Sequence, residues 1–238
     1  MTDARLQAEE AGRIDQIYTA RAYDVDPSYS DVDPVYLHRV QSIERVALQA
    51  LRACGLSGKL SDVRLLDFGC GNGRWFGRWL AWGASAVNLH GCDSRASAVA
   101  AARERLPLCR FEQCQEGRIP FGDAAYDVVV QNLVFSSILD SEIRQHAARE
   151  MARVVRPGGI VLSYDFMFDN PRNPNVRGVR IAEMRSLFPT FEQIFCRRVV
   201  LAPPLARRLV PLSWTMASLA EALVPPLRTH VLMALRRP

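Results

Sequence analysis

The chain has 238 residues and 49% of them are hydrophobic, which suits one α/β domain of ordinary size with a full core. Thirty lysines and arginines stand against 25 acids, for a net charge of +5, and every basic residue except Lys59 is an arginine. These arginines are scattered and form no basic block interleaved with aromatic residues. The composition therefore favours a solvated surface over a nucleic-acid-binding face, although a mildly basic surface suits an anionic substrate.

The cysteines and the N-terminus bear on the cellular compartment. No C-x-x-C pair and no histidine at metal spacing is present, so we expect no metal and interpret the cysteines as small residues in a reducing compartment. The N-terminus is polar and acidic, unlike a signal peptide, and no apolar run reaches the ~20 residues of a membrane span. These features predict a cytoplasmic protein.

The first sixty residues predict helices around an irregular segment. Residues 1–15 suggest a short or frayed helix, and residues 17–36 mix four tyrosines with aspartates and two prolines, which favours irregular structure. That segment either lines a ligand pocket or lies on the surface as an arm with aromatic anchors. Apolar residues recur at helical spacing over residues 35–56. We expect residues 1–60 to form an N-terminal helical cap.

Residues 63–73, V-R-L-L-D-F-G-C-G-N-G, combine a strand-type apolar run with a glycine turn. Gly69, Gly71 and Gly73 occupy every second position, and glycine lets a ligand approach the main chain without a Cβ in the way. A helical pattern follows at once, so amide N–H groups at its start would face that ligand. A second predicted strand, residues 87–92, delivers Asp93, whose carboxylate suits the two hydroxyls of a ribose.

Two classes of nucleotide ligand suit this unit. Dinucleotide enzymes need a third glycine where the helix packs on the strand, and Phe76 occupies that position here. Asp67, two residues before the first glycine, would repel a pyrophosphate but attract an ammonium group. Residues 65–73 closely resemble the first motif of the class I S-adenosylmethionine (SAM)-dependent methyltransferases. The string E-M-A-R-V-V-R-P-G-G-I-V-L extends the resemblance over about residues 62–166.

The resemblance implies a fold, a cofactor and its contacts. The fold would be α/β and Rossmann-like, with a seven-stranded, mostly parallel sheet whose last strand is antiparallel, and the cofactor would be SAM. Asp67 would face its ammonium, directly or through water, and Asp93 its ribose. Gln115, in place of the family's aspartate, would lie near the adenine, and Gln131 near the sulfonium. The implied cofactor contacts are Asp67, Gly69, Cys70, Gly71, Asn72, Gly73, Asp93, Ser94, Gln115, Glu116, Gln131 and Asn132.

Apolar runs and helical spacing place the remaining elements of the SAM-binding domain, which we expect to span residues 61–238. Helices are expected at residues 74–80, 94–106, 142–155 and 181–188. Strands are expected at residues 109–113, 126–135, 160–166 and 191–201, and the closing antiparallel strand at residues 229–235.

The segment after the strand at residues 160–166 predicts the acceptor site, because ligands of doubly wound sheets bind outside the carboxyl ends of the strands. Two X-Pro steps stiffen it among many polar side chains, although such residues also form self-bonded turns. Asp165 is the candidate general base, and Tyr164, Asn170, Asn173 and Arg177 are the candidate acceptor contacts. The segment resembles that of a bacterial methyltransferase subgroup found beside polysaccharide-building enzymes. This suggests O-methylation of a small hydroxylated acceptor related to sugars or glycans.

Residues 202–227 form an apolar, proline-punctuated insert with a predicted helix at residues 212–223. Because the insert leaves and returns at the carboxyl end of the parallel strands, we expect it to act as a lid over the acceptor pocket. Arginines around it allow a membrane-surface patch as an alternative, but a buried cap or a dimer contact is the favoured interpretation. The protein is expected to be a monomer or a homodimer.

Two other functions remain open. An NAD(P)-dependent oxidoreductase would use a similar fold, and Phe76 and Asp67 disfavour it. A non-catalytic partner protein with this fold is the second alternative. It remains open because residues 136–140 lack the histidine that many relatives carry there.

Overall fold

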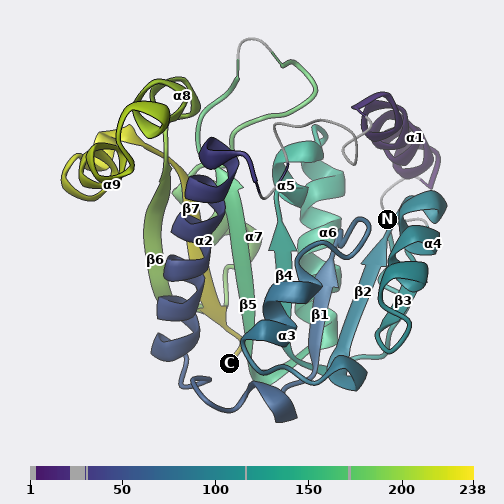
Figure 1. Ribbon diagram of the computed structural model, residues 1–238. Coiled ribbons are helices and arrows are strands. Elements are labelled where there is room, and N and C mark those ends of the chain that lie inside the picture. Colours follow the sequence, from purple (N-terminus) through teal and green to yellow (C-terminus); the bar gives the residue numbers. More distant parts are fainter. Residues whose placement is uncertain (1–3, 22–29, 31, 116, 171–172) are drawn as a thin grey trace.

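The computed structural model describes residues 4–21, 30, 32–115, 117–170 and 173–238. Its centre is a seven-stranded sheet with the order β3-β2-β1-β4-β5-β7-β6 (Figure 1). β7 pairs antiparallel with both neighbours, and the other pairs are parallel, so the predicted Rossmann-like α/β fold is confirmed. The strands are β1 (Leu65–Phe68), β2 (Leu89–Asp93), β3 (Arg110–Gln113), β4 (Tyr126–Asn132), β5 (Val155–Phe166), β6 (Glu192–Leu201) and β7 (Arg228–Arg236).

Helices cover both faces of this sheet (Figure 1). They are α1 (Ala4–Arg21), α2 (Pro34–Ala53), α3 (Phe76–Ala81), α4 (Ala96–Arg105), α5 (Val134–Ser137), α6 (Ser141–Val154), α7 (Ile181–Leu187), α8 (Pro203–Leu212) and α9 (Trp214–Leu223), with 3-10 turns η2 (Leu60–Asp62), η3 (Ala86–Asn88) and η4 (Pro225–Leu227). Within the described part of the chain, none of these helices has the length and apolar character needed to cross a membrane.

The two faces of the sheet pack into separate apolar layers. Side chains alternate along each strand, so Leu65 of β1 joins the layer under α2, α3 and α4, and Leu66 joins the layer under α6 and α7. Strands covered on both faces have apolar residues at nearly every position, and this explains the unbroken run in β4. The carboxyl ends of β1, β2, β4 and β5 therefore meet at one edge, between the two layers.

The chain departs from the predicted strand at residues 126–135 after Asn132. Leu133 adopts a left-handed conformation with φ of 63°, and α5 begins at the next residue. The side-chain oxygen of Gln131 accepts the backbone N–H of Val134 at 2.9 Å, and the hydroxyl of Ser137 donates to the Leu133 carbonyl at 2.9 Å. These side-chain bonds terminate the strand although its apolar pattern continues.

The insert holds two helices where the sequence pattern predicted one. α8 begins with two prolines, which are compatible with the first turn of a helix, and α9 follows after Ser213. Both helices pack against α2 and β6, at the same edge of the sheet as the glycine turn (Figure 1). Whether this insert acts as a lid stays a prediction.

The N-terminal residues contribute helices at two separate places. α2 packs along β6 and β7. α1 lies over the segment after α5: the Glu10 carboxylate accepts the backbone N–H of Leu139 at 2.7 Å, and the Arg13 guanidinium donates to the Ser137 carbonyl at 2.5 Å. Two tyrosines of the expected pocket-lining segment, Tyr23 and Tyr29, lie outside the described residues.

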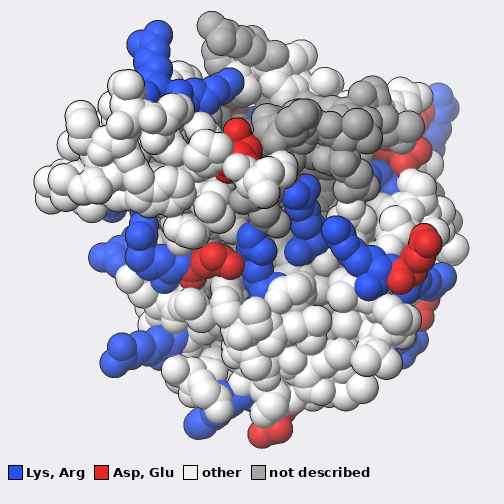
Figure 2. All heavy atoms as spheres, viewed as in Figure 1, with Lys and Arg blue, Asp and Glu red and all other residues white. Residues whose placement is uncertain are grey.

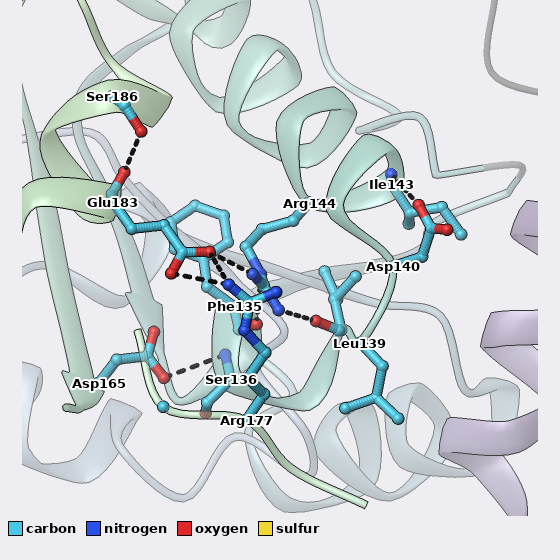
Figure 3. Close-up of polar contacts among 12 residues, drawn as sticks. Phe135, Ser136, Leu139, Asp140, Ile143, Arg144, Asp165, Arg177, Glu183 and Ser186 are labelled. Atoms are coloured by element: carbon cyan, nitrogen blue, oxygen red, sulfur yellow. Dashed lines mark hydrogen bonds and ion pairs between the residues drawn. The ribbon is translucent and has the colours of Figure 1, made fainter. Parts of the chain in front are cut away.

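A buried arginine fixes α5 to the helices behind the sheet (Figure 3). Arg144 of α6 is 1% exposed, and its guanidinium donates to the Phe135 carbonyl at 2.9 Å and to the Ile138 carbonyl. The same group pairs with the carboxylate of Glu183, on α7, at 2.5 Å. Burial lowers the pKa of Arg144, and Glu183 opposes that shift. One side chain therefore joins α5, α6 and α7 on the face opposite α2.

We expect Arg144→Met to lower the free energy of unfolding by about 3 kcal/mol, because two backbone carbonyls and a carboxylate lose their donor. Chemical denaturation monitored by circular dichroism measures this change. Arg5→Met is the control, since Arg5 forms an exposed i,i+4 pair with Glu9 on α1 and should cost at most about 0.5 kcal/mol. Equal stabilities of the two variants would contradict a structural role for Arg144.

Candidate functional site

The glycine turn connects β1 to α3 at the carboxyl edge of the sheet. Gly69, Gly71 and Gly73 all have positive φ, at 74°, 55° and 74°. A Cβ on Gly69 would clash with Val134 of α5, so this position requires glycine for space as well as for conformation. The turn is bonded to β2: the N–H groups of Gly69 and Cys70 donate to the Cys92 carbonyl at 2.8 and 3.1 Å.

Asp67 lies beneath this turn with an unsatisfied carboxyl oxygen. Its side chain is 2% exposed, and its Oδ1 has no hydrogen-bond partner among the described residues. Burial, reinforced by the nearby Asp93 carboxylate, raises the pKa of Asp67 to about 8. Asp67 borders a small cavity of about 30 Å³ that Asn132, Trp75 and Tyr164 also line. A buried carboxyl oxygen without a partner needs an explanation, and a cationic ligand group is one that would satisfy it.

Asp93 already has partners. Its Oδ2 accepts the N–H of Gly71 at 2.9 Å, and its Oδ1 accepts the N–H and the Nε of Arg95 at 3.0 and 3.1 Å. The Arg95 guanidinium in turn lies over the ring of Tyr18, from α1, at 4.6 Å. A ribose that uses this carboxylate must therefore replace the Arg95 contact.

The residues expected near the adenine stand at the ends of β2 and β3. The Ser94 carbonyl accepts the side-chain amide of Gln113 at 2.9 Å. The backbone of Gln115 forms an isolated β-bridge with Arg118, and the Gln115 side chain is exposed. Glu116 lies outside the described residues.

Asp165 and Gln131 form a buried pair on the opposite face of the sheet from Asp67. The Gln131 amide donates to the Asp165 carboxylate at 2.9 Å and to the Ser163 hydroxyl at 2.5 Å. The backbone N–H of Ser136 donates to the other Asp165 oxygen at 3.2 Å (Figure 3). Burial raises the pKa of Asp165 to about 7, against the effect of these donors and of Arg144.

This arrangement bears on two of the roles expected from the sequence. Asp165 is 0% exposed with both oxygens bonded, so its carboxylate is not open to an acceptor in this conformation. Gln131 is also 0% exposed and holds the turn into α5, and it lines the same cavity as Asp67, so its place near the cofactor stays a prediction. The sequence pattern does not show whether Asp165 faces a ligand or the interior, because a carboxylate at a strand end can face either layer of the fold.

The residues expected to contact the acceptor differ in their exposure and in their partners within the chain. Tyr164 is buried and stacks on His230, with ring centroids 5.3 Å apart. Asn173 accepts the N–H of Asn175 at 3.2 Å within its own turn, and Arg177 pairs with Glu183 at 3.0 Å. Asn170 is exposed at the start of the segment. Asn173 and Arg177 thus have structural partners, as the self-bonded alternative anticipated.

Sequence reasoning missed two residues at this edge and named a third, Tyr18, only as part of a segment that could line a pocket. Arg95 lies between Asp93 and the ring of Tyr18, and His230 lies beside Tyr164 at the start of β7. Burial lowers the pKa of His230 to about 3, so its imidazole is neutral at pH 7. β7 is antiparallel to β5 and β6, so it begins at the edge of the sheet where they end. This rule could have placed residues 228–230 at the same edge as the glycine turn.

Comparisons with known proteins agree with this geometry. Residues 65–159 match a family model described as a methyltransferase domain. A probable tRNA methyltransferase 9B of Mus musculus is 34% identical over 98 residues, which are 41% of this chain and 20% of that protein. The 27-O-demethylrifamycin SV methyltransferase of Amycolatopsis mediterranei is 32% identical over 122 residues, 49% of this chain and 43% of that protein. This chain spans about a fifth of the length of the first curated relatives it matches.

A solved structure extends the likeness to nearly the whole chain. The crystal structure of magnesium protoporphyrin IX methyltransferase from Synechocystis PCC 6803, with bound SAM, superposes with a TM-score of 0.65. The alignment covers 96% of this chain and 97% of that one at 13% sequence identity, a level that establishes the shared fold. Residues 65–159 are therefore similar to a methyltransferase domain, and the whole chain shares the fold of this SAM-bound structure.

Proposed function

We propose that this protein binds SAM at the glycine turn and transfers its methyl group to an acceptor held at the same edge of the sheet. The observation that carries the proposal is Asp67, a buried carboxyl whose Oδ1 lacks a partner directly below a turn of positive-φ glycines. The ammonium of SAM would supply that partner, directly or through one water. A pyrophosphate would not, and this disfavours the dinucleotide alternative.

The chain's own residues then have separate tasks. When bound, SAM supplies a methyl group on a sulfonium, a good electrophile that needs an aligned nucleophile. Gly69 and Gly71 leave the main chain open to the ligand. Asp93 would bind the ribose once Arg95 leaves it, and Gln115 would accept the adenine amino group. Asn132, beside Asp67 at the cavity, is the nearest candidate for the methyl-bearing end.

We assign Asp165 a positioning role in place of contact with the acceptor. Its carboxylate fixes Gln131, and Gln131 fixes the left-handed turn at Leu133 that brings Val134 against Gly69. The shape of the glycine turn therefore depends on Asp165 through two intermediate contacts. Residues 1–60 as a cap and residues 202–227 as a lid remain part of the proposal, with α1 closing the side where Tyr18 covers Arg95.

The proposed acceptor is a small hydroxylated molecule related to sugars, methylated on oxygen. Asn170, at the segment's exposed start, supports this class, and Asp169 beside it holds the segment by accepting the backbone N–H of Gly178 at 2.9 Å. The methyltransferase of Amycolatopsis mediterranei is named for an O-demethylated small molecule, whereas the Mus musculus relative is named for tRNA. The scattered arginines of this chain favour the small molecule.

Replacing Asp67 with asparagine should weaken SAM binding about 10- to 100-fold, because the ammonium loses its charged partner. Isothermal titration of SAM and S-adenosylhomocysteine measures this change. Asp127→Asn is the matched control. Asp127 lies at the start of β4, at the edge of the sheet opposite the glycine turn, where its carboxylate accepts the Arg64 N–H and pairs with Arg156. Unchanged affinity in Asp67→Asn would remove Asp67 from the site, and no binding by the wild type would overturn the proposal.

SAM affinity should rise with pH between about 5.5 and 7, by up to tenfold per unit. With a pKa of about 8, Asp67 carries a proton in the free protein, and a bound ammonium favours the carboxylate, so binding releases that proton. The rise should flatten near pH 8, where Asp67 ionises without ligand. Titrations in two buffers of different ionisation enthalpy measure the released proton. In Asp67→Asn the proton release should disappear, and its persistence there would assign it to another group.

Methyl transfer from labelled SAM should place the label on hydroxylated sugar acceptors and leave bulk tRNA unlabelled. Scintillation counting after separation of small molecules from tRNA distinguishes the two classes. Label in the tRNA fraction would keep the methyltransferase and replace the proposed acceptor. The variant Asp93→Ala should remove transfer to either acceptor.

A further inference from the structure

The outer face of the insert exposes an unusual number of apolar side chains. Leu212 and Leu223 are 78% and 73% exposed. α8 and α9 project from the sheet at one corner of the molecule (Figure 1). We call the exposed apolar residues of this corner the insert patch: Leu212, Trp214, Met216, Leu219, Leu223 and Val224. The sequence favoured a buried cap or a dimer contact here; within this chain these six side chains are exposed, and the dimer contact stays a prediction.

α9 is two-faced, and only one face is used inside the protein. Ala217 and Glu221, four residues apart, face inward and are buried. Glu221 accepts the hydroxyl of Ser42, on α2, at 2.8 Å and the N–H of Val200, on β6, at 3.2 Å. Met216, Leu219 and Leu223 follow at steps of three and four on the outer face. The inner contacts hold the helix in place, so the outer stripe is a fixed feature of the fold.

The exposed charges that the insert and the end of β6 contribute have one sign. Arg207 and Arg208 of α8 are exposed, as are Arg197 and Arg198 of β6. Glu221 is the single acid between residues 197 and 228, and it is buried. Figure 2 shows this corner as a largely uncharged lobe with basic side chains at its upper margin and acidic side chains beside it toward the middle of the molecule. An apolar surface whose own helices expose arginines and no acid complements an anionic one.

We propose that the insert patch docks onto an anionic membrane surface. Apolar side chains and a tryptophan would enter the headgroup boundary, and the arginines would meet lipid phosphates. α9 has ten residues and is about 15 Å long, which suits a helix lying in the interface. A second copy of the chain is a poorer occupant, because two such patches would oppose arginine to arginine. The proposal does not depend on methyl transfer.

Flotation of the full chain with vesicles tests this proposal. We expect binding to vesicles of phosphatidylcholine and phosphatidylglycerol (3:1), at least tenfold weaker binding to phosphatidylcholine alone, and weakening by 0.5 M NaCl. The pair Leu219→Ser with Leu223→Ser should lose at least tenfold in the bound-to-free ratio, as should Arg207→Glu with Arg208→Glu. Matched controls are Leu108→Ser, an exposed apolar residue distant from the insert, and Arg105→Glu, on α4, and both should bind like the wild type.

Three results would overturn the proposal. The first is absence of binding to the anionic vesicles, and the second is equal binding by the insert variants and the wild type. The third comes from sedimentation velocity: a dimer that the Leu219 and Leu223 changes dissociate would make the patch an interface between copies. Circular dichroism melts of each variant show whether lost binding reflects unfolding, and Met216→Ser alone, at a 56% exposed position, provides a milder change.

Discussion

Two buried carboxyls govern the functional edge of this protein, and they are compensated in different ways. Asp165 faces the α6–α7 layer, where Gln131, the N–H of Ser136 and the nearby Arg144 offset its burial. Asp67 faces the other layer, and its Oδ1 has no partner in the described chain. Because a buried carboxyl oxygen without a partner is costly, Asp67 is the carboxyl to which the proposal assigns a ligand, and Asp165 the one to which it assigns a structural task.

The surroundings of these carboxyls form a connected support. Arg144 holds the carbonyls of α5, and Val134 of α5 in turn rests on Gly69. On the other side, α1 bonds the chain after α5 through Glu10 and Arg13. The glycine turn is therefore shaped by residues far from it in sequence, and changes in α6 or α1 reach it through backbone groups.

The sequence was sufficient for the fold and for placing the glycine turn, Asp67 and Asp93 at the carboxyl edge of the sheet, because periodicity, glycine spacing and the two acids are local patterns. It was insufficient for Asp165, since the direction of a side chain at a strand end depends on the register with β4 and on the turn at Leu133. It was insufficient for Arg95 and His230 for a related reason: their partners, Tyr18 and Tyr164, are distant in the chain. Apolar content alone also could not show which face of α9 is buried.

If the cofactor's ribose uses Asp93 as proposed, the contact between Arg95 and Asp93 competes with it for the same carboxylate. The arginine is tethered two residues from the carboxylate, so it is always present at the site, and its stack on Tyr18 adds to the closed arrangement. A nucleoside that used this carboxylate would bind in the fraction of molecules in which the guanidinium has left it. Its apparent affinity is the intrinsic affinity multiplied by that fraction. Under the proposal, a contact that moved α1, and with it the ring of Tyr18, away from Arg95 would raise the apparent affinity for the cofactor without touching the cofactor.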